Sequence, residues 1–213
     1  MSALISIMLV DDHVVVRSGL RRLLEQNDDM EVIAEAESGE QAYQLFGEYL
    51  PDVLVMDMSM PGMGGLEAVR RILARFPAAR IVIFSMHENA TFATQALTAG
   101  ARGYVAKSGA ADDLVLGIRE ANAGRSYLSA AIAQKIALQS LSGDEDPIKR
   151  LSAREFAVFQ LLAEGNAVEQ IAETLNISQK TVANYQTLLK QKLGINSPVE
   201  LVRLAIRYGV IQG

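Results

Sequence analysis

The chain of 213 residues contains no cysteine, and only two of its residues are histidine, His13 and His87. The absence of cysteine excludes a disulfide scaffold and any site with thiolate ligands. Two histidines are too few for the usual imidazole-based zinc sites. No apolar run approaches the ~20 residues that a membrane-spanning helix needs, and the N-terminus lacks the basic start of a signal peptide. We therefore expect a cytoplasmic protein with no membrane partner.

The charge is unevenly divided along the chain. The net charge is −5, yet residues 148–213 carry eight lysines and arginines against five glutamates, which leaves +3 there and −8 in the remainder. Half of all residues are apolar and 21% are charged, so the chain can bury sizeable cores. A mildly basic part joined to a strongly acidic one indicates two domains with different partners.

Short apolar runs alternate with helical patterns in residues 1–125. The apolar runs predict strands that are buried on both faces of a parallel sheet, at residues 4–10, 31–36, 52–57, 80–85 and 102–107. Apolar residues at steps of three and four predict helices at residues 14–26, 39–50, 65–76, 89–100 and 110–124. This order predicts a doubly wound, flavodoxin-like α/β domain with a five-stranded parallel sheet, whose ligands bind beyond the carboxyl ends of the strands.

The alternation of apolar runs and helical patterns ends after residue 125. Residues 126–147 begin with a helical pattern and end on "SGDEDP", a charged breaker suited to a linker. Residues 148–213 show no strand pattern, and they predict four short helices at 151–165, 167–176, 178–194 and 197–209. Two pairs are spaced as capping boxes for the first and last of these helices, Ser152 with Glu155 and Ser197 with Glu200. The C-terminal domain is therefore predicted to be all-α.

Polar residues stand at the carboxyl ends of the predicted strands. Asp11 and Asp12 end the first strand, Asp57 the third and Ser85 the fourth, and Lys107 follows the fifth. Because these ends meet at one edge of a parallel sheet, one crevice should hold all five side chains. Three crowded carboxylates repel one another and favour a hard divalent cation with oxygen ligands, such as Mg²⁺. The lysine and the hydroxyl group could bind an anion beside it.

Residues next to this site are interpreted as structural. His13 follows the acidic pair and is expected to be a polar residue at a helix start rather than a metal ligand, because no second histidine is near it in the sequence. Met56 and Met86 are predicted to pack in the core. The methionines of the loop after Asp57 are predicted to make loop contacts; they are Met58, Met60 and Met63.

The N-terminal region resembles the receiver domains of bacterial two-component response regulators over its whole length. The motifs "LVDDH", "VLVMDMSMPGMGG", "FSMH" and "GYVAKS" carry the resemblance, and "DDHVVVRSGL" is similar to the NarL/FixJ subfamily. The resemblance implies that a sensor histidine kinase phosphorylates Asp57. It also implies a Mg²⁺ ion that is bound by Asp12 directly, by Asp11 largely through water, by Asp57 and by the backbone carbonyl of Ser59.

The same resemblance assigns roles to the remaining polar residues. Lys107 would contact the phosphoryl group. Ser85 and Tyr104 would form a switch pair, in which the hydroxyl group moves toward the phosphoryl group and the aromatic ring turns inward. A new charge on Asp57 would thereby shift an equilibrium between two conformations.

Residues 167–176 and 178–194 have the spacing of a helix-turn-helix. In the second helix, Tyr185 is predicted to lie on the flank, and the residues that face the core are Val182, Leu188, Leu189 and Leu193. The residues left outside are suited to phosphate and base contacts, and they are Lys180, Thr181, Asn184, Thr187, Lys190 and Lys192.

This C-terminal part, residues 148–213, resembles the LuxR-type DNA-binding domain through "LSAREFAVFQLLAEG", "IAETLNIS" and "KLG". That family usually has a lysine where Ala183 stands and a histidine where Tyr185 stands. Loss of a lysine removes one contact to DNA and lowers the affinity and its salt dependence. The usual sequence preference of the family is therefore not expected here, and Asn184 with Thr187 is expected to carry much of the base discrimination.

Together these features predict a response regulator transcription factor whose phosphorylation controls sequence-specific binding to promoter DNA. The implied partners are the sensor kinase, RNA polymerase and a second copy of the chain in an active homodimer. No enzymatic activity is expected beyond the gain and loss of its own phosphoryl group.

Two other functions are weighed against this one. A phosphatase with an aspartate nucleophile would carry a second aspartate two residues later, where Ser59 stands. A phosphorylation-gated module that binds protein or RNA through its tail stays open because of Ala183 and Tyr185. A dinucleotide-binding fold is disfavoured, since no glycine-rich turn follows the first strand.

Overall fold

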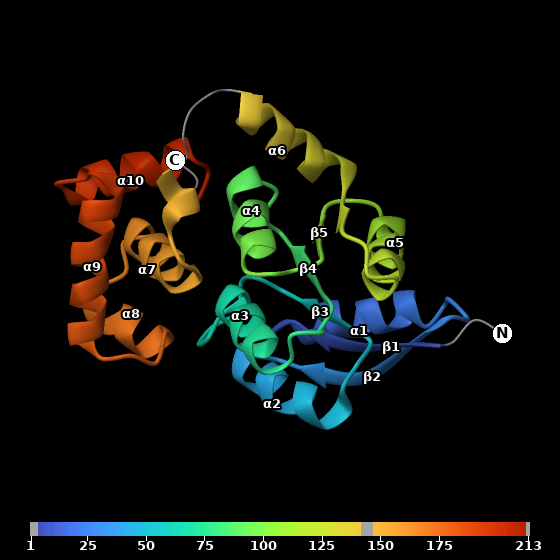
Figure 1. Ribbon diagram of the computed structural model, residues 1–213. Helices are drawn as coiled ribbons and strands as arrows, with labels where there is room; N and C mark the ends of the chain where they lie inside the picture. Colours follow the sequence, from blue (N-terminus) through green and yellow to red (C-terminus); the bar gives the residue numbers. More distant parts are fainter. Residues whose placement is uncertain (1–3, 142–146, 212–213) are drawn as a thin grey trace.

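The computed structural model describes residues 4–141 and 147–211, and its N-terminal part is a parallel sheet between two layers of helices (Figure 1). Six strands lie in the order β2-β1-β3-β4-β5-β6, and all neighbouring pairs are parallel. The strands are β1 Ile5–Val10, β2 Met30–Ala36, β3 Val53–Met56, β4 Ile81–Ser85, β5 Gly103–Ala106 and β6 Tyr127–Leu128.

The prediction of five strands was one strand short. β6 has two residues, which pair with Gly103 and Tyr104 of β5. Both are half-buried and lie between Ser126 and Ser129, so no apolar run marks this strand in the sequence.

Helices cover both faces of the sheet. One layer contains α1 Val14–Leu24 and α5 Ala111–Asn122, and the other contains α2 Gly39–Tyr49, α3 Gly65–Arg75 and α4 Ala90–Thr98. The strands are apolar throughout because alternate side chains enter different cores. In β3, Val53 and Val55 belong to the core under α1 and α5, whereas Leu54 and Met56 belong to the other core. This construction brings the loops that follow the strands to one edge of the sheet.

The C-terminal part is all-α, as predicted. After β6 comes α6 Ala130–Leu141, and after the 3₁₀ turn η1 Pro147–Arg150 come α7 Ala153–Ala163, α8 Val168–Thr174, α9 Gln179–Leu193 and α10 Pro198–Arg207. Residues 142–146, most of the predicted linker breaker, lie outside the described residues. Among the helices that the structure describes, none is both long enough and apolar enough to cross a membrane.

Local signals fix the ends of these helices. The capping box of Ser152 and Glu155 is present at α7. The Ser197 hydroxyl accepts from the Glu200 N–H, but the Glu200 carboxylate bonds to the N–H of the residue before Ser197, so that box is only half formed. Gly194 ends α9 with a φ of 66°, a conformation that glycine adopts without strain.

Helix α4 joins the two parts of the molecule. Its Phe92 ring meets the Phe156 ring of α7 edge to face, with 5.0 Å between the centroids. Its polar side chains donate to backbone carbonyls of the C-terminal part: Gln95 to Ile148 at 2.7 Å, Thr91 to Tyr208 at 3.1 Å, and the N-cap residue Asn89 to Gly209. A single apolar core that includes both phenylalanines runs through the two parts. The C-terminal helices therefore dock on the α3 and α4 side of the sheet (Figure 1).

The loop between β3 and α3 requires glycine. Gly62 and Gly64 have φ values of 76° and 68°. A Cβ atom on Gly65, the first residue of α3, would lie 2.0 Å from the carbonyl oxygen of Asp57. Helix α3 thus begins directly against the backbone at the end of β3.

We expect Gly65→Ala to lower the free energy of unfolding by roughly 1–3 kcal/mol, because the added methyl group must push α3 away from Asp57. Urea denaturation followed by circular dichroism measures the change. Gly19→Ala in α1 is the matched control, since nothing lies within 4 Å of a Cβ atom there and alanine is favoured over glycine in a helix by about 1 kcal/mol. Equal effects of the two substitutions would contradict the close approach at Gly65.

Candidate functional site

Three carboxylates lie together at the carboxyl edge of the sheet. Asp11 and Asp12 follow β1 and Asp57 follows β3, and one ligand atom from each, with one from His13, lies within 4.8 Å of all the others. Asp11 and Asp57 are only 1% and 3% exposed. The Met58 N–H donates to Asp57 Oδ1 at 2.8 Å and orients that carboxylate. The structure therefore brings together the acidic residues that the sequence placed in one crevice.

Lys107 supplies the positive charge in this cluster. Its Nζ lies 2.5 Å from Asp11 Oδ2 and 3.2 Å from Asp57 Oδ2. Burial raises the pKa of Asp57, the Lys107 ammonium opposes that shift, and the Asp11 charge adds to it. One ammonium group cannot balance three carboxylates, so the pocket keeps an excess of negative charge.

This excess charge fits a hard cation. Asp12 Oδ1 is buried and accepts no hydrogen bond from the residues that the structure describes, although His13 Nδ1 lies 2.9 Å from it. A carboxylate oxygen without a donor, beside two other carboxylates, belongs to the set of oxygen ligands that Mg²⁺ favours. The acidic pocket is therefore compatible with Mg²⁺.

His13 stands at the N-cap of α1, as expected, but its side chain does not cap the helix. Its Nδ1 lies 3.2 Å from Asp11 Oδ1 and 2.9 Å from Asp12 Oδ1, while the side chain is 67% exposed. The imidazole therefore lies on the solvent side of the acidic pocket.

Ser85 and Tyr104 are both fully buried, and both bond to the same residue. The His87 N–H donates to Ser85 Oγ at 3.1 Å, and the Tyr104 hydroxyl donates to the His87 carbonyl at 2.7 Å. Burial raises the pKa of Tyr104, so its phenol is neutral at physiological pH. The Tyr104 ring is thus already turned inward in this docked arrangement.

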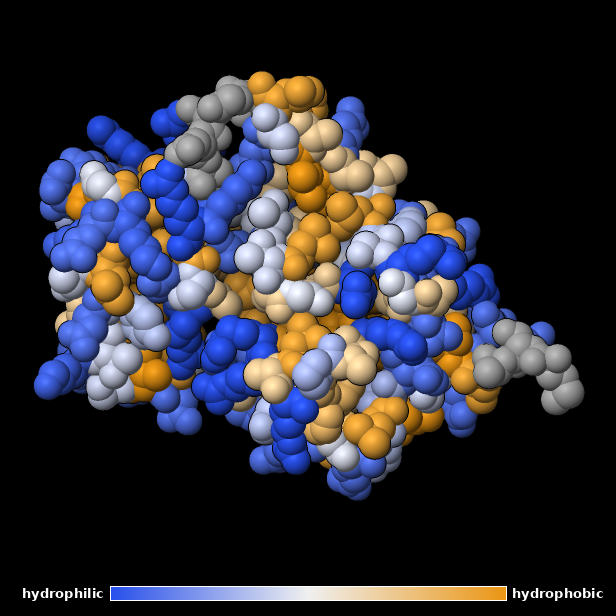
Figure 2. Space-filling model, in the orientation of Figure 1, coloured by the Kyte–Doolittle hydropathy of each residue, from blue (hydrophilic) through white to orange (hydrophobic). Residues whose placement is uncertain are grey.

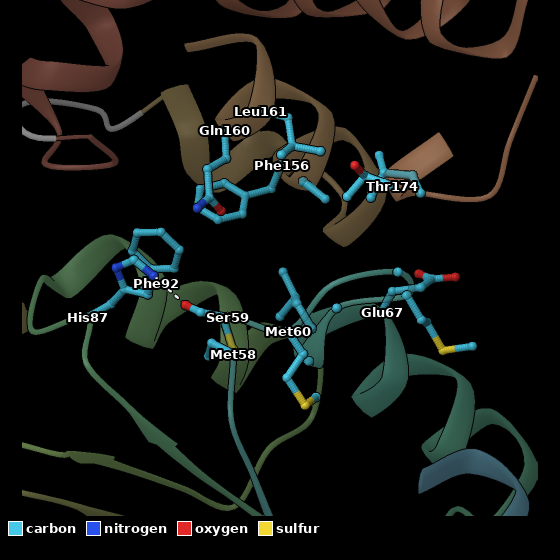
Figure 3. Close-up of a pocket in the computed structure, with 17 residues that line it drawn as sticks. Met58, Ser59, Met60, Glu67, His87, Phe92, Phe156, Gln160, Leu161 and Thr174 are labelled. Atoms are coloured by element: carbon cyan, nitrogen blue, oxygen red, sulfur yellow. Dashed lines mark hydrogen bonds between the residues drawn. The ribbon is translucent and has the colours of Figure 1, made fainter. Parts of the chain in front are cut away.

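His87 is the residue that sequence reasoning missed. Its ring is stacked on Phe92, with 3.9 Å between centroids and 5° between planes, and its Nε2 lies 2.9 Å from Ser59 Oγ in a hydrogen bond (Figure 3). Burial lowers the pKa of His87 and keeps the imidazole neutral at pH 7. No sequence signal pointed to this role, because a lone histidine in a loop reveals no partner through spacing.

The methionines near the site differ from expectation. Met56 is fully buried, as predicted, but Met86 is 70% exposed because it lies just beyond the last residue of β4. The three loop methionines Met58, Met60 and Met63 are buried. They line a cavity of about 110 Å³ between the sheet domain and α7 and α8, together with Phe92, Phe156, Leu161 and Thr174 (Figure 3).

Helices α8 and α9 form the predicted helix-turn-helix. Val182 and Leu189 are fully buried, and Leu193 is partly buried. The prediction that Leu188 faces the core was wrong: it is 41% exposed, because it lies one residue, or about 100°, around the helix from Leu189. Tyr185 packs on the flank.

Tyr185, at which the chain departs from the usual LuxR-type pattern, is partly buried and packs against the apolar core that both parts of the molecule share.

The outward residues of α9 fall into two groups. Lys180, Asn184, Thr187 and Lys190 are exposed, although the Thr187 hydroxyl donates to the Ala183 carbonyl. Two others have partners within the domain: Thr181 Oγ1 lies 2.8 Å from Ser178 Oγ, and Lys192 Nζ lies 2.7 Å from Glu155 Oε1. Hydrophilic side chains dominate this end of the molecule in Figure 2, whereas apolar side chains gather along α6.

Glu155 holds two elements together. Its side chain caps α7 through the Ser152 N–H and pairs with Lys192 of α9. Burial opposes the charge of Glu155, but the bonds from Lys192 and Ser152 prevail and lower its pKa. The carboxylate is thus charged and fully engaged.

Comparison with known proteins agrees with this construction. Residues 7–119 match the family described as "Response regulator receiver domain", and residues 149–205 match "Bacterial regulatory proteins, luxR family". The chain is 39% identical to the response regulator UvrY of Escherichia coli K12 over 97% of this chain and 96% of UvrY. It is 38% identical to the response regulator GacA of Pseudomonas aeruginosa over 98% of each chain.

A solved structure is similar over nearly the whole length. RcsB from Salmonella enterica serovar Typhimurium, bound to a promoter in the presence of the phosphomimetic BeF3-, is 30% identical with a TM-score of 0.73. The match covers 94% of this chain and 97% of RcsB.

A parallel α/β sheet with an acidic cluster at its carboxyl edge, followed by a helix-turn-helix, defines a two-domain regulator of transcription. The expected fold class and function class are confirmed. The chain belongs to the NarL/FixJ-type response regulators, which join a receiver domain to a LuxR-type DNA-binding domain.

We expect Glu155→Gln to destabilise the C-terminal helices at pH 7 by roughly 1–3 kcal/mol, the range for hydrogen bonds to charged groups. Because the pKa of Glu155 is lowered in the folded state, its stabilisation is present above the unfolded value and is lost as pH falls through the folded value. The difference between the wild type and the variant should therefore shrink below about pH 4. Hydrogen exchange of α7 and α9 amides measures it.

Glu173→Gln, at an exposed position of α8, is the control and should change stability by less than about 0.5 kcal/mol. A Glu155→Gln effect that stays the same from pH 7 to pH 3.5 would contradict the charged pair with Lys192.

Proposed function

We propose that a sensor histidine kinase phosphorylates Asp57 in the presence of Mg²⁺, and that this modification controls promoter binding by α9. Residues 1–125 are the phosphoacceptor domain, 126–147 the connection and 148–213 the DNA-binding domain. The observation that carries the proposal is the cluster of Asp11, Asp12 and Asp57, which a single lysine does not neutralise, in a molecule whose other end is a helix-turn-helix.

Asp57, Lys107 and Ser85 have separate roles in the phosphoryl transfer. A phosphoryl group passes from the kinase histidine to a carboxylate oxygen of Asp57; the P–N bond breaks, its electron pair stays on the histidine, and a P–O bond forms. Lys107, whose Nζ is 3.2 Å from Asp57, holds an oxygen of the incoming group. The Ser85 hydroxyl accepts from the His87 N–H and also bonds to Tyr104, so it would exchange these partners to donate to the phosphoryl group.

The cation would be held by Asp11, Asp12, Asp57 and the Ser59 backbone carbonyl, with Asp12 as a direct ligand and Asp11 acting largely through water. The bound ion supplies charge neutralisation as two anions approach each other. The Oδ1 of Asp12, which accepts no hydrogen bond from the described residues and has only the exposed His13 ring beside it, supports this set. Hydrolysis of the aspartyl phosphate by water later resets the site, and this is the only reaction that the chain performs on itself apart from taking up the phosphoryl group.

Asp57→Asn should abolish Mg²⁺-dependent labelling by acetyl phosphate or by a cognate kinase, because the amide is not a nucleophile. Phosphate-affinity electrophoresis or intact-mass spectrometry measures the labelling. Asp28→Asn, at an exposed position of the same domain, is the control and should label like the wild type. Undiminished labelling of Asp57→Asn would refute the assignment of the phosphoacceptor.

The DNA contacts are assigned to the outer face of α9: Lys180, Thr181, Asn184, Thr187, Lys190 and Lys192. Four of these residues are exposed without an ion pair among the described residues, and Lys192 reaches phosphate only by sharing or leaving Glu155. The chain acts as a homodimer and recruits RNA polymerase.

Asn184→Ala should weaken binding to the preferred sequence by about 1–3 kcal/mol and lower the preference at one base position, since an asparagine amide reads a base edge. Lys180→Ala should instead weaken all sequences alike and reduce the salt slope by about 1. Selection of DNA sequences with phosphorylated protein, followed by titrations at several salt concentrations, measures both. Equal weakening of all sequences by Asn184→Ala would contradict its role in base recognition.

A further inference from the structure

His87 lies where the acidic site meets the docked C-terminal domain. One side of its imidazole bonds to Ser59, two residues after Asp57, at 2.9 Å. Its face stacks on Phe92 at 3.9 Å, and Phe92 meets Phe156 of α7 at 5.0 Å with an angle of 88°. A series of direct contacts thus runs from the β3–α3 loop through two stacked rings, His87 and Phe92, to the DNA-binding domain (Figure 3).

The backbone of the same residue holds both members of the switch pair. Its N–H needs Ser85 Oγ as an acceptor, and its carbonyl receives the Tyr104 hydroxyl. If the Ser85 hydroxyl moves toward Asp57, the His87 N–H loses its hydrogen-bond acceptor. Buried backbone groups seek replacement partners when they lose one, so this movement displaces the backbone that carries the imidazole.

The next two residues prevent that displacement from being absorbed by the loop. Glu88 accepts hydrogen bonds from Ser108 and from Lys135 of α6. Asn89 caps α4 and donates to Gly209. With the β4–α4 loop fixed at these points, a shift at Ser85 is passed to the ring of His87.

We propose that His87 couples phosphorylation of Asp57 to release of the DNA-binding domain. The inference rests on the proposed function, because it requires Asp57 to be the phosphoacceptor. Without a phosphoryl group, the ring holds Ser59 and Phe92 together and the domains stay docked. When Ser85 turns to the phosphoryl group, the backbone of His87 shifts while its Nε2 stays bonded to Ser59, so the ring is drawn off Phe92. Phe92, which contacts Phe156 of α7, then loses its stacking partner. Because coupling is reciprocal, a docked domain also disfavours phosphorylation.

Two substitutions distinguish the role of the His87 ring from the role of its hydrogen bond to Ser59. His87→Phe keeps a ring to stack on Phe92 but removes Nε2, so the β3–α3 loop is no longer tied to it. His87→Gln keeps a polar group but removes the ring. If His87 only filled space, both variants would loosen the interface in the same direction.

The absence of cysteine allows the domain arrangement to be measured directly. Glu48→Cys in α2 and Gln191→Cys in α9, both exposed, accept a pair of spin labels. Double electron–electron resonance then gives the docked and released populations with and without BeF3- and Mg²⁺. Circular dichroism confirms that each variant is folded.

We expect BeF3- to release the domain in the labelled chain with His87 intact. His87→Phe should stay docked, and its response to BeF3- should fall about fivefold, the effect of one hydrogen bond. His87→Gln should shift toward the released form about fivefold without BeF3-, the effect of one aromatic pair. Phe156→Leu, which disturbs the stack from the other domain, should be released like His87→Gln and still respond to BeF3-.

An equal response of the wild type and His87→Phe to BeF3- would overturn the coupling role. Labelling of Asp57 by acetyl phosphate is measured for every variant, so a defect in the chemistry is seen separately. If the labelled chain with His87 intact takes no phosphoryl group and does not respond to BeF3-, the proposed function itself fails. If it responds and His87→Phe responds equally, only the role of His87 is lost.

Discussion

Three carboxylates share one edge of the sheet with a single lysine, and the receiver is organised around this unbalanced charge. Asp11 and Asp57 are almost fully buried, so water does little to screen their repulsion. Lys107 pairs with Asp11 and Asp57, whereas Asp12 has only the exposed imidazole of His13 beside its Oδ1. The site is therefore sensitive to any added anion. One further negative group changes the ion-pair and hydrogen-bond partners that its charged and polar side chains prefer.

The contact between the domains combines a shared apolar core with a small set of specific polar and aromatic contacts. It includes one aromatic pair between α4 and α7 and three side-chain hydrogen bonds from α4. Each is worth about 1 kcal/mol, so they contribute only a few kcal/mol. Coupling free energies between sites in proteins are typically about 1–3 kcal/mol. These four contacts together are therefore comparable in size to a typical coupling free energy, and they act in addition to the apolar core that both domains share.

Much of this architecture could be predicted because it depends on local patterns. Strands buried on both faces are apolar throughout, and the parallel topology then places Asp11, Asp12, Asp57, Ser85 and Lys107 at one edge. In the same way, the sequence indicated that Ser152 begins α7 and that Gly194 ends α9. β6 was missed because two half-buried residues form no pattern.

Other features depend on contacts between distant residues, which spacing does not reveal. Leu188 is apolar and adjacent to a buried leucine, yet the helix turns it outward. Lys192 resembles a phosphate ligand by position, and only the fold shows its pair with Glu155. His87 likewise makes contacts that its position in the sequence does not reveal. It bonds to Ser59, 28 positions before it, and stacks on Phe92 of the next helix.

The hydrogen bonds from α4 to the DNA-binding domain have a further consequence for how the sequences of such proteins diverge. Asn89, Thr91 and Gln95 all donate to main-chain carbonyls, at Gly209, Tyr208 and Ile148. Any amino acid offers that acceptor, so these bonds place no demand on side-chain identity in the DNA-binding domain. The recognition helix can therefore acquire new base preferences over evolutionary time while the receiver continues to recognise the domain by its backbone.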